Sequence, residues 1–170
     1  MNVQRGTAQF VVRCISRMLM IEGTGENFNL GQNVSPDADL PKFTVNRYQR
    51  VFEFTRGRWR QDLTRVPNYV TANTAAQQIV TAVDGAAAFN INPDGSAVRQ
   101  PDSVGKDRQQ EIYHHPLGFL NAVFSERGTA SNTRTVGEFE AVDLTIDGVT
   151  YTMYVDPKTK LPAKVTSPIY

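Results

Sequence analysis

Cysteine and histidine are scarce in this chain, with one cysteine and two histidines among 170 residues. A single cysteine excludes an intramolecular disulfide and a zinc cluster built on thiolates. Cys14 lies in an apolar stretch, where we interpret it as a small buried hydrophobic residue rather than a nucleophile.

Charge of one sign is not in excess either, because 18 basic and 17 acidic residues leave a net charge of +1. A general nucleic-acid binder should show a surplus of basic residues, so this class is not expected. The chain has no apolar run of the length that crosses a membrane, and we expect no membrane span. Residues 10–21 are interrupted by Arg13 and Arg17 and lack the cleavage site of a signal peptide, so cytoplasmic residence is the default expectation. An exported, periplasmic form with a different N-terminus is the alternative.

Several catalytic motifs are missing as well. The sequence has no Gly-x-Ser-x-Gly elbow, no phosphate-binding loop, no dinucleotide fingerprint and no His-Glu-x-x-His zinc motif. The common hydrolase, kinase and dehydrogenase patterns therefore give no lead to a function.

What the chain does have is the composition of one globular domain, which we assign to residues 1–170, with 40% hydrophobic and 21% charged residues. The clearest helical pattern of its second half lies within residues 99–125, where apolar residues recur from Ile112 to Phe124. Pro116 falls inside this pattern, so we expect a kink or a break into two shorter helices at residues 115–116.

Alternating segments lie on both sides of this helix. Hairpins are predicted for residues 43–54 with 59–66, across Gly57, and for residues 78–83 with 86–91, across Asp84 and Gly85. Later strands are predicted at residues 136–146, 149–155 and 161–165, with residues 126–133 as a turn. Residues 21–30 form the first clear strand, and 3–20 are interpreted as a helix, with a strand as the competing interpretation.

These elements predict an α+β fold, in which a curved antiparallel sheet of six to eight strands, a half-open β-barrel, wraps one or two helices. Oligomeric state is left open, although exposed strand edges permit sheet extension. The side chains expected in the core are Phe28, Tyr48, Phe52, Phe54, Trp59, Leu63, Phe89, Leu117, Leu120, Phe124, Leu144, Ile146, Tyr151 and Val155.

Two patterns carry candidate chemistry. Glu111 and His115 share a helix face, so the glutamate could orient the histidine as a general base; the alternative is one packed and one exposed residue in the His114–His115 pair. Residues 90–95 imitate the start of a calcium loop, with Asn90, Asn92 and Asp94 at alternate positions before a glycine. Pro101 stands where such a loop needs a glutamate, so an ordinary turn is the alternative.

Three segments together resemble a known family: Ile21-Glu22-Gly23-Thr24-Gly25, Glu111 with His115-Pro116-Leu117, and residues 155–165, VDPKTKLPAKV. They are similar to the LolA/LppX-like half β-barrel that carries lipoproteins and lipids in bacterial envelopes. The same module is found ahead of metallo-β-lactamase-fold hydrolases, whose His-x-His-x-Asp-His metal motif this chain lacks. The likeness extends to short quorum-quenching hydrolases of this fold, known from metagenomes.

The resemblance implies hydrolysis of the lactone ring of N-acyl-homoserine lactones. Ca²⁺ is expected to assist this reaction, and no organic cofactor is expected. The residues assigned to catalysis are His115, Glu111 and Arg60. The acyl chain, as part of a small amphipathic ligand, is assigned to Tyr48, Phe52, Trp59, Leu117 and Leu120, and the metal to Asn90, Asn92 and Asp94. The alternatives are a non-catalytic module that binds a lipid, lipoprotein or acyl ligand, and the N-terminal module of a larger hydrolase.

Overall fold

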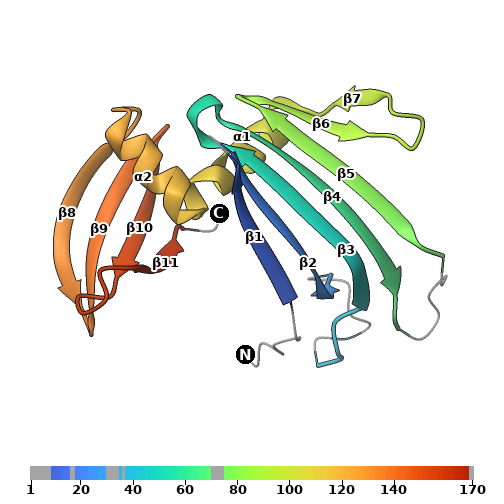
Figure 1. The fold of residues 1–170 in the computed structure, drawn as a ribbon, viewed down its shortest axis with the longest axis horizontal. Helices are drawn as coiled ribbons and strands as arrows, with labels where there is room; N and C mark the ends of the chain where they lie inside the picture. The colour runs from blue at the N-terminus through green and yellow to red at the C-terminus, as the bar shows by residue number, and fades with distance from the viewer. Residues whose placement is uncertain (1–8, 16–17, 30–34, 36, 70–74, 169–170) are drawn as a thin grey trace.

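A computed structural model describes residues 9–15, 18–29, 35, 37–69 and 75–168. Its strands form two open antiparallel sheets, one of seven strands and one of four, and two α-helices lie between them in the chain and in space (Figure 1). The predicted α+β class and the antiparallel pairing are therefore confirmed. The strands are divided between two sheets, whereas the sequence predicted a single one.

The seven-stranded sheet is a meander in which each strand pairs with the next along the chain. Its strands are β1 (Gln9–Ile15), β2 (Met18–Phe28), β3 (Lys42–Glu53), β4 (Arg58–Pro67), β5 (Gln77–Asp84), β6 (Ala87–Ile91) and β7 (Ala97–Arg99). Consecutive hairpins bury the apolar side chains of alternate positions on one face, which is why a run of alternating segments folds this way.

The helix expected over residues 3–20 is wrong for the part of it that the structure describes. Gln9 to Ile15 instead pair with Met18 to Thr24 as neighbouring antiparallel strands. The β-branched pair Val11-Val12 after Phe10 favours a strand, and the edge of β2 supplies hydrogen bonds that a helix would have to make internally. Residues 3–8 and 16–17 of the expected helix and residue 30 of the expected first strand lie outside the described residues.

The hairpin predicted around Gly57 is confirmed. The short 3₁₀ helix η1 (Phe54–Arg56) connects β3 to β4, and Gly57 has a φ of 64°, a conformation that favours glycine. The next hairpin turns at Gly85 and Ala86, one residue later than expected, because Asp84 still pairs with Ala87.

The helical stretch breaks where proline predicts. Helix α1 (Asp102–His114) ends before His115, whose extended backbone leads into α2 (Pro116–Phe124) with Pro116 in its first turn. The junction is tight, since a Cβ placed on Gly118 would lie 1.9 Å from the carbonyl oxygen of Ile112. Only glycine allows the two helices to approach this closely.

The four-stranded sheet has the order β11-β10-β9-β8. Its strands are β8 (Thr129–Val136), β9 (Phe139–Ile146), β10 (Val149–Val155) and β11 (Pro162–Thr166). The turn at Asp147-Gly148 is confirmed, but residues 126–133 are not only a turn, because β8 begins at Thr129. The side chains of β8 are almost all exposed and polar, as suits an edge strand, and this is why its sequence shows no alternation.

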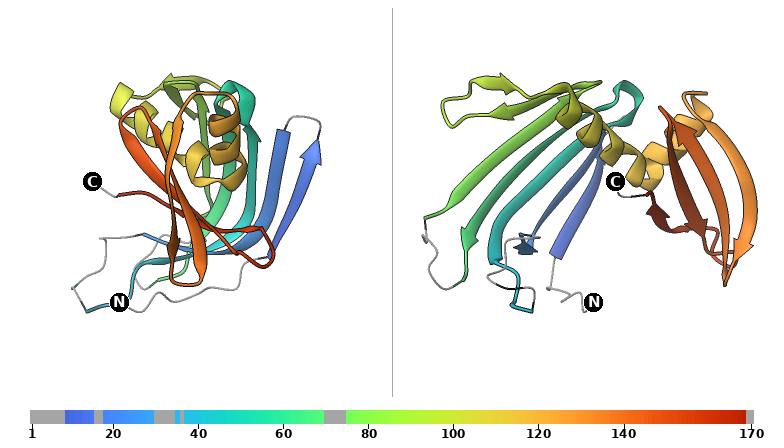
Figure 2. Two further views of the ribbon diagram at one scale, coloured as in Figure 1. Left: turned by 90° about the vertical axis from the view of Figure 1, so that its left-hand side faces the viewer. Right: turned by 180° about the vertical axis from the view of Figure 1, so that it is seen from behind.

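The helices fill the space between the two sheets at one end of the strands, and the sheets diverge toward the other end (Figures 1 and 2). One cluster of buried side chains joins all three parts: Leu19, Phe52, Trp59, Val83 and Ala88 from the large sheet, Ile112, Tyr113, Phe119 and Ala122 from the helices, and Leu144, Ile146, Tyr151 and Met153 from the small sheet. Neither helix of the described chain is long and apolar enough to span a membrane.

Twelve of the fourteen expected core residues are buried or half-buried, but Leu117 and Phe124 are not. Their exposed fractions are 47% and 81%. The tight junction turns Gly118, Phe119 and Ala122 inward, so the opposite stripe of α2 faces solvent. A helix that is apolar on all sides gives no sequence pattern that says which side is buried.

Candidate functional site

The face of the large sheet that carries Trp59 is the one that α1 covers. Trp59 on β4 is 4% exposed, and its Nε1 donates a hydrogen bond of 2.9 Å to the carbonyl oxygen of Arg108 in α1. Phe52 lies opposite Trp59 on β3 and Val83 opposite it on β5, so the three side chains share this inner face. The helix thus sits on a row of closely packed apolar side chains.

Arg50 lies two residues from Phe52 on β3 and therefore points to the same inner face. Its side chain is only 12% exposed, and its Nη2 donates to Oε2 of Glu111 on α1 at 2.5 Å. The guanidinium carbon lies 4.0 Å from the ring centre of Trp59 and 4.7 Å from that of Phe52. Cation–π contacts of this kind hold the charged group in a fixed position among apolar rings.

The hydrogen bonds of this guanidinium are incomplete. Its Nε atom is buried and has no hydrogen-bond partner among the described residues. A buried N–H without a partner costs about 1–3 kcal/mol, so such a group is rarely retained without a reason. Arg50 is the most unusual charged residue on the inner face.

Beyond Arg50, along the strands and away from the helices, the inner face has apolar side chains bordered by polar ones, with Gln61 beside Arg50 and Arg65 past Leu63. Ile21 lies directly opposite Arg50, and the next row joins Tyr48, Leu63 and Ile79 across β3, β4 and β5. Leu63 is buried and the others are half-buried. Figure 2 shows that the helices lie only at one end of these strands. We call this set, Ile21, Tyr48, Leu63 and Ile79, the inner apolar row.

The three residues predicted to be catalytic do not form a single group. Glu111 forms an ion pair with Arg50, while Nδ1 of His115 accepts a hydrogen bond from the backbone N–H of Leu117 at 3.2 Å. Arg60 follows Trp59 on β4 and so points to the opposite face, where it pairs with Asp62. The large sheet separates Arg60 from Glu111 and His115.

The surroundings of His115 make it a poor general base. Its ring lies against Phe52 and Phe54, with ring centres 5.5 and 5.1 Å apart. Burial lowers the pKa of His115, and the nearby charge of Arg50 lowers it further, so the imidazole is neutral at pH 7. Since Nδ1 accepts a hydrogen bond, the proton of the neutral ring is on Nε2, which leaves no free lone pair to take up another.

His114, the other member of the pair, is in contact with the small sheet. Its Nε2 lies 2.7 Å from Oγ of Ser167, and its ring packs edge-on against Tyr151. Burial lowers the pKa of His114, and Glu111 opposes this effect. The two histidines thus point to different parts of the fold, because α1 ends at His114 and the backbone of His115 is extended.

The residues predicted to bind an acyl chain are split in the same way. Phe52 and Trp59 are buried in the core under the helices, and Tyr48 belongs to the inner apolar row. Leu117 and Leu120 lie on α2, with Leu117 on its exposed stripe. Only Tyr48 lies on the part of the inner face that continues beyond the helix-covered core.

The predicted calcium ligands have other partners. Oδ1 of Asn90 accepts from Nη2 of Arg108 at 2.7 Å, and Nδ2 of Asn92 donates to Oγ of Ser96 at 3.0 Å. Oδ1 of Asp94 accepts from the backbone and hydroxyl of Ser96, which lowers the pKa of this carboxyl. These bonds describe a closed turn, and the described residues contain no group of three or more His, Cys, Asp or Glu side chains placed to hold a metal ion.

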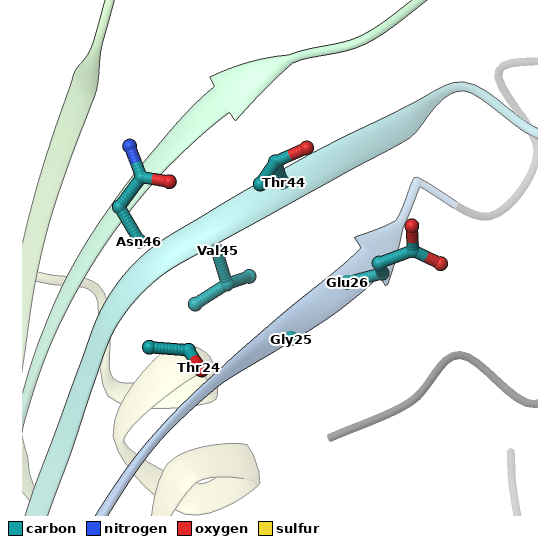
Figure 3. Close-up of a pocket in the computed structure, with 6 residues that line it drawn as sticks. All are labelled: Thr24, Gly25, Glu26, Thr44, Val45 and Asn46. Carbon is teal, nitrogen blue, oxygen red and sulfur yellow. The ribbon is translucent and has the colours of Figure 1, made fainter. Parts of the chain in front are cut away.

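One pocket of about 460 Å³ lies where β2 and β3 both depart from regular pairing, after Gly23 and after Val45. Its lining residues are Thr24, Gly25, Glu26, Thr44, Val45 and Asn46. Figure 3 shows Asn46 and Glu26 at opposite ends of it, and Glu26 also pairs with Lys42. Polar groups that do not converge give no defined ligand site.

Sequence reasoning missed Arg50, although the sequence contains a hint. Arg50 shares its alternation with Tyr48 and Phe52, so a charged residue occupies an apolar position of the strand. Arg60, whose side chain lies on the opposite face, was assigned to catalysis instead. Comparison of the chain with protein-family models, curated protein sequences and solved structures returned no match, so the likeness to half β-barrels stays a prediction.

Proposed function

We propose that this protein is a module that binds a small amphipathic acyl ligand on the inner face of its large sheet. The observation that carries the proposal is the inner apolar row, which lies beyond the helix-covered core on the same face of the sheet and starts beside a charged side chain, Arg50. A binding site for an amphipathic molecule needs an apolar surface with a few polar groups at one end. The row and Arg50 supply both.

Lactone hydrolysis is the weaker form of the proposal. It needs an activated water and a group that stabilises the oxyanion. His115 has its Nδ1 occupied, Glu111 is paired with Arg50, and Arg60 is on the other face. Binding without turnover therefore accounts better for the arrangement of the side chains. Lactone opening stays a prediction, and the experiment described next tests it together with binding.

The experiment is a mass-spectrometric count of bound ligand and of ring-opened product per protein. Purified protein is mixed with an excess of N-dodecanoyl-homoserine lactone, once with calcium and once with a chelator. We expect one ligand held per chain and no ring opening above the protein-free rate. Many turnovers that disappear with the chelator would establish a metal-assisted lactonase, and the absence of both binding and turnover would refute the proposal.

A matched pair of variants locates the ligand. Ile79→Lys places a charge in the inner apolar row, whereas Gln78→Lys places the same charge on the other face of the same strand, at an exposed position. We expect Ile79→Lys to weaken binding about tenfold or more, since a buried charge without a partner is costly. Gln78→Lys should bind like the unchanged protein, and equal losses in both variants would place the ligand elsewhere.

A further inference from the structure

We propose that Arg50 recognises the carboxylate head group of the acyl ligand, with the chain running along the inner apolar row. This inference rests on the proposed binding function and narrows it to one class, the acyl carboxylates. It separates a ligand with a negative charge from a neutral lactone with the same chain.

The first step is the cost of placing a cation at this position. Burying a charged group is unfavourable unless it is paired and hydrogen-bonded. The side chain of Arg50 is 12% exposed, yet its ion-pair partner Glu111 has 44% of its side chain exposed. The pair is thus asymmetric, with a fixed, buried cation and an anion at the border with solvent.

The second step is the number of hydrogen bonds that the guanidinium still offers. It carries five N–H groups in a planar fork that matches the two oxygens of a carboxylate. Nη2 donates to Glu111, but the buried Nε has no partner. A ligand carboxylate in place of Glu111 would be able to accept from both Nη2 and Nε, the bidentate geometry that gives the strongest pairs.

The third step is that Glu111 can leave at little cost. Its side chain is close to half exposed, so it can turn into water, where a carboxylate is well solvated. Trp59 and Phe52 meanwhile keep the guanidinium in place through their ring contacts. The glutamate thus holds the position of a carboxylate while no ligand is bound.

The fourth step is the location of the apolar chain. Arg50 and Tyr48 are two residues apart on β3, and Tyr48 lies opposite Leu63. A molecule with its carboxylate on Arg50 and its chain directed away from the helices therefore meets the inner apolar row at once. A ligand with a neutral head group cannot form an ion pair with Arg50, whose positive charge then has only Glu111 as its partner.

The test is a calorimetric titration with four probes that each carry a twelve-carbon chain: dodecanoate, dodecanol, N-dodecanoyl-homoserine lactone and its ring-opened acid. We expect the two carboxylates to bind about tenfold or more tightly than the two neutral probes, as a charge-assisted bidentate pair predicts. The comparison of dodecanoate with the ring-opened acid then distinguishes a fatty acid from a hydrolysed signal molecule as the source of the carboxylate.

Variants assign the preference to the residue. Arg50→Gln should remove the preference for carboxylates, and Arg50→Lys, which keeps the charge but not the fork, should retain part of it. Arg60→Gln is the matched control, because Arg60 lies on the other face of the neighbouring strand and pairs with Asp62. It should bind all four probes like the unchanged protein.

A second readout needs no change at Arg50, in case such variants fail to fold. The Nε–H of Arg50 has no partner among the described residues, so a carboxylate that accepts from it should move its nuclear magnetic resonance signal downfield. Dodecanoate should produce this shift and dodecanol should not.

The outcomes separate the two proposals. Equal affinity for dodecanoate and dodecanol, or a preference that survives in Arg50→Gln, would overturn the role of Arg50 and leave the binding function standing. An Nε–H signal of Arg50 that does not move when dodecanoate is bound would do the same. If none of the four probes binds, the binding function itself is wrong.

Discussion

Replacement of Gly118 by alanine is expected to lower the free energy of unfolding by about 3 kcal/mol or more, a large part of the stability of a domain this size. The added Cβ would lie 1.9 Å from the carbonyl oxygen and 2.9 Å from the carbonyl carbon of Ile112, and 3.2 Å from Cδ1 of Phe54. The first two are backbone atoms, which cannot rotate away. The junction of α1 and α2 would have to open, and with it the core that both sheets share.

Chemical denaturation of Gly118→Ala and of a control, Gly95→Ala, measures this effect. A Cβ at Gly95 would meet nothing within 4 Å, although the φ of 85° there costs about 1–2 kcal/mol for a residue with a side chain. Gly95→Ala therefore measures the cost of backbone strain alone, and the additional loss in Gly118→Ala measures the cost of the clash. If Gly118→Ala is no less stable than Gly95→Ala, the tight junction is not a feature of the folded protein.

The second large effect is expected at Asp143, a buried carboxylate on β9 with 8% of its surface exposed. It accepts hydrogen bonds from Nδ2 of Asn132 at 2.7 Å, Nη1 of Arg134 at 2.8 Å and Oγ1 of Thr152 at 2.7 Å. Asp143→Asn removes the negative charge and replaces one accepting oxygen with an NH₂ group. This group would face the side chains that now donate to the carboxylate. We expect a loss of about 3 kcal/mol in the free energy of unfolding.

The loss should depend on pH. Burial alone would raise the pKa of Asp143, but the hydrogen bonds from Thr152, Asn132 and Arg134 outweigh it, and the pKa is lowered. The carboxylate therefore stabilises the fold above its unfolded pKa of about 3.9, and this contribution disappears as the pH falls through the lower, folded value. Asp143→Asn should lack this acid-dependent part of the stability curve.

A matched control for Asp143 is available on the large sheet. Asp62→Asn breaks the ion pair with Arg60, an arginine whose side chain is 56% exposed, and should cost at most about 1 kcal/mol. Denaturant titrations of both variants at neutral and acidic pH make the comparison. Equal, small losses for the two would show that the cluster around Asp143 does not hold the edge strand β8.

The sequence predicted those parts of the fold that local chemistry decides. Gly57, Asp147-Gly148 and Pro116 fix a turn or a helix break through their own backbone preferences, and all three are confirmed. The N-terminal helix failed because residues 10–15 have a pattern that suits both structures, and the neighbouring strand β2 decided between them. Edge strand β8 gave no alternation because neither of its faces is buried.

The candidate site was harder to predict than the fold. The pairing of Glu111 with Arg50 joins residues 61 positions apart, so no local spacing announces it. The expected partnership of Glu111 with His115 rested on helix geometry, but the break at Pro116 turned His115 away to cap α2. Arg60 was predicted because of its positive charge, but the alternation of side chains along β4 places it on the face opposite to Trp59.

Trp59, the only tryptophan of the chain, allows the most direct test of the central claim that an acyl ligand binds on the inner face. Its ring lies 4.0 Å from the guanidinium carbon of Arg50, so a ligand there should change its fluorescence. Titration with dodecanoate should give a saturable change at one ligand per chain, and the change should be strongly weakened in Ile79→Lys and kept in Gln78→Lys. A fluorescence that does not respond in the unchanged protein, while dodecanoate is bound by calorimetry, would contradict the assignment of the site to this face.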